Sequence, residues 1–115
     1  MRMITQGLND GYAGVYKPKD IEADFGANIS PKSIDDMDYF VDMAYAEEYK
    51  REQDYEFAEA KGHSLSLKIR TLLYEAIDKN YKVVVENTLY NILKIDYAKA
   101  ENVMYLYLEE ERSIA

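Results

Sequence analysis

The chain of 115 residues has no cysteine and no tryptophan, and His63 is its single histidine. Without cysteine there is no disulfide, no thiolate nucleophile and no thiolate-bound metal. A single histidine also argues against most zinc, copper and iron sites, because these usually draw on several imidazoles. We therefore expect no metal site, no cofactor and no enzymatic activity.

Long hydrophobic runs are missing as well. No segment approaches the ~20 consecutive apolar residues that span a bilayer. Residues 1–14 hold no apolar run of the kind found in signal peptides. We expect a soluble, intracellular protein without a membrane partner.

Positive charge is scarce. The chain has 14 lysines and arginines against 22 acids, a net charge of −8. Most of the acidity lies in residues 20–62, which hold thirteen acids and four bases. Contacts to nucleic-acid phosphates need clustered lysine and arginine. The composition therefore argues against nucleic-acid binding through a basic face.

The sequence does contain enough apolar material for a folded core. Hydrophobic residues make up 48% and aromatic residues 13% of the chain, which is not the composition of a disordered polyanion. The length fits one compact domain.

The second half of the chain alternates between apolar and polar residues, as strands do. The Asn87-Thr88 pair predicts a tight hairpin turn, and residues 98–102 form a second short connection. The predicted strands are residues 64–71, 81–86, 89–97 and 103–110. Short connections between the last three predict an antiparallel meander.

Residues 51–61 are the best helix candidate, because they are rich in Glu, Ala, Gln and Lys and end before Gly62. We expect Tyr55, Ala58 and Gly62 to share one stripe of this helix. Its glutamates should point into water; they are Glu52, Glu56 and Glu59. Residues 39–49 fit either a strand or a helix start, and we interpret them as a strand running into the helix.

Residues 1–34 hold four of the five glycines and both prolines. We expect an extended arm and loops there, followed by a single domain over residues 35–115. Four or five strands in an open flat sheet would expose two edges. The fold we predict is mainly β with one short helix: a small, distorted, partly open antiparallel β-barrel.

Two fragments resemble chemical motifs. Residues 62–66 come close to the G-x-S-x-G nucleophile elbow, but Ser66 replaces the last glycine and the predicted context is helix-to-strand. Residues 20–24 resemble the opening of a calcium loop, but Phe25 and Pro31 stand where glycine and glutamate are required. We interpret residues 62–66 as a loop that enters a strand, and residues 20–24 as a solvated acidic loop.

Tyrosine is abundant, with twelve copies. It offers a large contact area with a polar tip, which suits protein interfaces. The tyrosines that we predict at subunit interfaces are Tyr45, Tyr49, Tyr55, Tyr90, Tyr105 and Tyr107.

Residues 45–111 resemble the small head-closure proteins of long-tailed phages of Gram-positive bacteria, also called head–tail joining, connector or stopper proteins. The resemblance rests on the order of several pieces. These are AYAEE at 44–48, REQDYEFAE at 51–59, SLSLKIRT at 64–71, LYNI at 89–92 and MYLYLE at 104–109. The order covers over half of the chain, whereas residues 1–34 match only loosely.

This resemblance implies a distorted β-barrel with a helix, assembled with copies of itself into a twelvefold or sixfold ring. The ring would lie at the head–tail junction of the virion, assembled in the host cytoplasm. It would sit beneath portal and adaptor proteins, bind a tail-completion protein below, and close the DNA channel after packaging. Viral DNA would pass through without specific binding.

An acidic channel lining would repel DNA phosphates and keep their passage smooth. The acidic residues that we predict at the lumen are Glu52, Glu56, Glu59, Asp35, Asp36 and Asp38. Two other structural or binding roles stay open. One is a tail-completion or terminator protein, and the other is an acidic DNA mimic that inhibits a host nuclease.

Overall fold

The computed structural model describes residues 2–3, 7–19 and 37–114. Strands dominate, with one α-helix in this part of the chain. The elements are β1 (Arg2–Met3), β2 (Gly11–Pro18), β3 (Met37–Glu47), α1 (Glu52–Ala60), β4 (Leu67–Leu72), β5 (Lys82–Val85), β6 (Thr88–Ala98), the 3-10 helix η3 (Lys99–Glu101) and β7 (Val103–Ser113).

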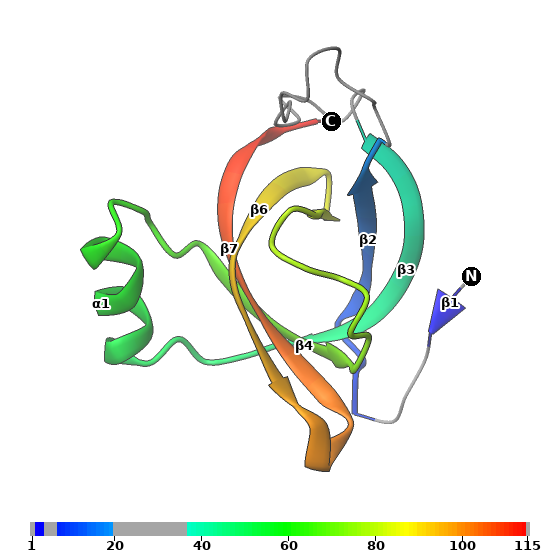
Figure 1. Cartoon of the computed structure of the whole chain (residues 1–115), viewed down its shortest axis with the longest axis horizontal. Helices are drawn as coiled ribbons and strands as arrows, with labels where there is room; N and C mark the ends of the chain where they lie inside the picture. The colour runs from blue at the N-terminus through cyan, green and yellow to red at the C-terminus, as the bar shows by residue number, and fades with distance from the viewer. Residues whose placement is uncertain (1, 4–6, 20–36, 115) are drawn as a thin grey trace, which may run out of the picture.

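Six antiparallel strands form a closed barrel in the order β3-β2-β5-β6-β7-β4 (Figure 1). Closure comes from β4, which pairs with β3 as well as with β7. The barrel is therefore closed, whereas we predicted a partly open one. Closure gives each barrel strand two neighbours, which removes the exposed edges that favour aggregation.

The barrel interior is filled by apolar side chains from all six strands. Leu67 and Ile69 of β4 and Met104, Leu106 and Leu108 of β7 are buried, as their spacing predicts. Fully buried partners come from the other strands; they include Ala13, Val15, Val41, Met43, Val83 and Leu89. Irregularities in register lie in the β2–β3 and β6–β7 pairs, and such bulges bend strands enough to close a small barrel.

The meander of β5, β6 and β7 is confirmed. The tight turn lies one residue earlier than predicted, at Glu86 and Asn87, because Val85 pairs directly with Thr88. Both turn residues have positive φ, 49° and 63°. That is the type I′ geometry, whose twist matches the twist of the flanking strands.

Residues 11–18, which we predicted as part of an extended arm, form a barrel strand instead. Strand β2 lies between β3 and β5, and its Ala13 and Val15 are fully buried. Glycines and a proline gave this segment the composition of a loop, while burial between two strands determines its conformation. Residues 20–34 lie outside the described residues.

Helix α1 and strand β3 confirm the predicted strand-to-helix order. Figure 1 shows α1 set apart from the barrel, reached by a connection from β3 and left by another toward β4. Gly62 has a φ of +76°, and His63 N donates to the Ala58 carbonyl at 2.9 Å. Residues 62–66 are thus the loop that ends the helix, as interpreted.

The face that α1 buries differs from the predicted stripe. Ala58 is buried as expected, but Tyr55 is 42% exposed and Gly62 is exposed. The second buried residue of the helix is Asp54. A carboxylate is buried here because cations lie against it.

Candidate functional site

Asp54 is at the centre of a charged network that attaches α1 to the barrel. Its side chain is only 3% exposed. Lys68 of β4 contacts Asp54 Oδ2 through its ammonium at 3.0 Å, and the Arg51 guanidinium contacts Oδ1 at 2.9 Å. The Arg51 backbone N–H also donates to Oδ2 at 2.9 Å. One buried carboxylate therefore joins the start of the helix to a barrel strand.

The network changes the acidity of Asp54. Burial by itself raises the pKa of this carboxyl group, because it disfavours the charged form. Hydrogen bonds from Arg51 and Lys68, with the charge of Lys68, more than offset burial and hold the pKa far below its usual range. Asp54 is ionised at neutral pH.

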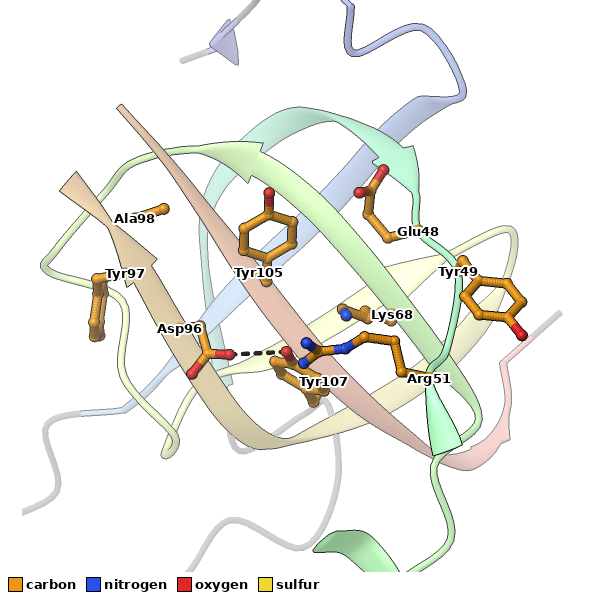
Figure 2. Close-up of a pocket in the computed structure, with 9 residues that line it drawn as sticks. All are labelled: Glu48, Tyr49, Arg51, Lys68, Asp96, Tyr97, Ala98, Tyr105 and Tyr107. Atoms are coloured by element: carbon orange, nitrogen blue, oxygen red, sulfur yellow. Dashed lines mark hydrogen bonds between the residues drawn. The ribbon is translucent and has the colours of Figure 1, made fainter. Parts of the chain in front are cut away.

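A hollow of about 470 Å³ lies beside this network (Figure 2). Tyr107 donates its hydroxyl to Asp96 Oδ2 at 2.8 Å. Figure 2 shows Arg51 reaching toward this pair. The residues that line the hollow are Glu48, Tyr49, Arg51, Lys68, Asp96, Tyr97, Ala98, Tyr105 and Tyr107.

The charged and aromatic side chains that line this hollow contact one another. The Lys68 ammonium lies 5.0 Å from the centre of the Tyr107 ring and 5.7 Å from that of Tyr105. Burial first, then the hydrogen bond and charge of Asp96, raise the pKa of the Tyr107 hydroxyl. The Lys68 ammonium therefore contacts both the Asp54 carboxylate and the ring of Tyr107. The arrangement acts as a brace that fixes α1 on the barrel.

A groove runs along the other side of α1, between the helix and β6. Its two adjoining parts have volumes of about 580 and 320 Å³. Phe57 and Leu93 are apolar residues shared by both parts, and Lys61 and Lys79 line both as well. This groove was not predicted, because it depends on how the helix stands relative to the barrel.

The predicted acidic residues fall into two separate groups. Glu52, Glu56 and Glu59 are all exposed on α1, as expected. Asp38 is exposed in β3, while Asp35 and Asp36 lie outside the described residues. Figure 1 shows α1 well apart from the start of β3, so one small patch does not combine Asp38 with the helix.

Two of the predicted interface tyrosines are exposed to solvent: Tyr49 is 85% exposed and Tyr55 is 42% exposed. Tyr90 and Tyr105 are half-buried. Tyr45 and Tyr107 must be corrected, because they are only 5% and 2% exposed. Tyr45 belongs to the barrel core, and Tyr107 packs under α1 against Ala58 and Leu65. Side chains buried within one copy offer little area to another.

Three further exposed tyrosines and the buried charges were not predicted. Tyr12, Tyr39 and Tyr97 are each about two-fifths to one-half exposed, at 40%, 50% and 39%. Asp54 could have been recognised from its place three residues after the N-cap residue Arg51, where acids cap helices. No comparable signal marks Lys68, which occupies a polar position of its strand.

The described residues contain no group of three or more histidine, aspartate or glutamate side chains that could hold a metal ion. Across the same residues, no helix has the length and apolar character needed to cross a membrane. No protein-family model matches this chain, and comparison with curated proteins finds no significant match either.

Proposed function

We propose that this protein is a structural subunit of the phage neck. In this role it forms a ring under the portal and its adaptor, closes the DNA channel after packaging and docks the tail. The order of sequence pieces over residues 45–111 supports the proposal. The fold agrees with what that resemblance implies, since it is a small barrel with one helix among the described residues.

The observation that carries the proposal is the braced, acidic helix α1. Its start is fixed to β4 by the buried Asp54–Lys68 pair. Its outer face presents Glu52, Glu56 and Glu59 to solvent, and we call this surface the acidic stripe. A rigid acidic surface at a channel wall repels phosphates, so DNA passes without being bound.

Exposed tyrosines supply surface for neighbouring copies. Tyr49, just before α1, is 85% exposed, and Tyr55 on the helix is 42% exposed. Ring formation requires a contact between two different surfaces of the subunit, repeated until it closes. The position of these tyrosines near Glu52, Glu56 and Glu59 supports subunit contacts next to the lumen.

Electron microscopy of particles from a phage lacking this gene, with the purified protein added back, tests the proposal. We expect tailless heads that have lost their DNA, and tailed particles after addition of the protein. Full heads beside separate, abnormally long tails would instead assign the protein to tail completion. Normal, infectious particles would remove it from the virion and favour the DNA-mimic inhibitor.

A further inference from the structure

The groove between α1 and β6 has a chemical character unlike the rest of this acidic protein. Its apolar lining includes Phe57 of the helix and Leu93 and Ile95 of β6. Three lysines also line it: Lys61, Lys79 and Lys94. Asp78 is the one acid that lines its larger part. A protein of net charge −8 thus carries a local cationic groove with an apolar floor.

Two of these lysines have no acidic partner in the described part of the chain. Lys94 contacts Asp96 at 3.5 Å. Lys61 and Lys79 form no ion pair with the carboxylates of residues 7–19 and 37–114. Lys61 instead lies 5.7 Å from the centre of the Phe57 ring. Unpaired cations beside apolar side chains suit a ligand that is both acidic and apolar.

One segment of the sequence has that combination. Residues 20–25 read Asp-Ile-Glu-Ala-Asp-Phe, so acids alternate with apolar residues at every position. In an extended peptide such alternation puts the acids on one face and the apolar side chains on the other. The segment carries three negative charges, which complement the lysines of the groove.

We propose that the groove binds residues 20–25 of a second copy of this chain. The contact joins two different surfaces, which is the kind of contact that closes rings. Residues 20–36 form a connection of 17 residues. Residue 25 lies seven positions after Pro18, the last residue of β2, so at about 3.3 Å per residue the segment can reach roughly 23 Å beyond the end of that strand. The inference rests on the proposed ring assembly, for which it supplies the subunit contact.

The first experiment measures binding of a fluorescently labelled synthetic peptide of residues 18–27 by anisotropy. The receptors are the full chain and a full-chain D20K/E22K/D24K variant, whose own segment cannot compete. We expect saturable binding to both receptors that weakens as salt is raised. K61E/K79E should weaken binding at least tenfold. K99E, an exposed lysine of η3, should leave it unchanged.

A peptide of the same composition with its acids made contiguous serves as the second control and should bind at least tenfold more weakly. Absence of saturable binding to both receptors would overturn the proposal, and so would binding that K61E/K79E does not change. Binding to the D20K/E22K/D24K receptor alone, together with a wild-type chain that stays monomeric by light scattering, would show that each chain fills its own groove, which also overturns the proposal.

Disulfide trapping checks that the contact is between copies. Because the chain has no cysteine of its own, only the introduced cysteines can form a disulfide. A23C and K79C single variants are mixed under mild oxidation. We expect a disulfide-linked heterodimer on a non-reducing gel, and none from A23C mixed with E101C. No heterodimer in the first mixture would overturn the second-copy contact. Rescue of particles by a chain that shows no trapping would reject this inference and leave the proposed function standing.

Discussion

Asp54 shows how a single buried charge can determine where a helix sits. Helix α1 has only Asp54 and Ala58 buried, so little apolar area attaches it to the barrel. The carboxylate of Asp54 instead holds Lys68 and Arg51 at hydrogen-bonding distance. A buried ion pair fixes geometry more than it adds stability, and removal of one partner is costly.

Substitution D54N should therefore destabilise the fold by roughly 3 kcal/mol, because Lys68 then stays buried without its counter-charge. Urea unfolding followed by circular dichroism measures this loss. The exposed E56Q change on the same helix should stay within about 0.5 kcal/mol. The double variant D54N/K68M should recover much of the loss. A D54N protein as stable as the wild type would show that the network does not brace the helix.

Asp54 also predicts how stability depends on pH. Its pKa is lower in the folded protein than in the unfolded chain, where it is about 3.9. Its contribution is therefore complete well above pH 4 and is lost as the pH falls toward the folded pKa. The stability difference between wild type and D54N should narrow below about pH 4. A difference that stays constant from pH 7 to pH 2.5 would contradict this assignment.

At the residue scale, the sequence predicts exposure better than it predicts charged contacts. Helical spacing correctly places Glu52, Glu56 and Glu59 in water. Alternation equally places Lys68 on the outer face of β4, yet it is 6% exposed. Helix α1 covers that face. The alternation within β4 does not indicate where the helix packs, so the burial of Lys68 could not be predicted.

At the scale of elements, the β5–β6 hairpin offers a clear test of local structure. Glu86 and Asn87 both have positive φ, and a glutamate is a poor residue for that region. The variant E86N/N87G supplies the preferred type I′ pair and should stabilise the protein by about 1 kcal/mol. Thermal and urea unfolding check the gain. Glycine at Thr88, inside the paired strand, should destabilise instead; a stabilising T88G would refute the turn assignment.

Elements with strong alternation were predictable, and β2 was not. Strands β5 and β7 show their apolar face in the sequence itself, and it is the face that the barrel buries. In β6 the buried Leu89 and Ile92 are three residues apart, where the register is irregular. In β2, Gly11, Gly14 and Pro18 obscure a short Ala13–Val15 pattern. Its strand conformation depends on pairing with β3 and β5. These contacts are distant along the chain, so sequence alone could not show that they close the barrel.

At the scale of the whole molecule, charge is divided between surfaces. The outer side of α1 carries the acidic stripe, while lysines line the groove next to the helix. Because the barrel closes on itself, ring contacts are not needed to cover sheet edges. In the ring that we propose, neighbouring copies can then meet through side chains and leave Glu52, Glu56 and Glu59 available to the channel.

The acidic stripe yields the last prediction, which rests on the proposed function. Particles carrying E52K/E56K/E59K should assemble and bind tails, but they should eject DNA several-fold more slowly, because lysines at the channel wall attract phosphates. Ejection from single particles, followed with a DNA-binding dye, measures the rate. E75K/E101K, which changes exposed acids elsewhere, should eject normally. Unchanged kinetics in the triple variant would mean that α1 does not face the DNA, whereas failure to bind tails would place the stripe at a protein contact.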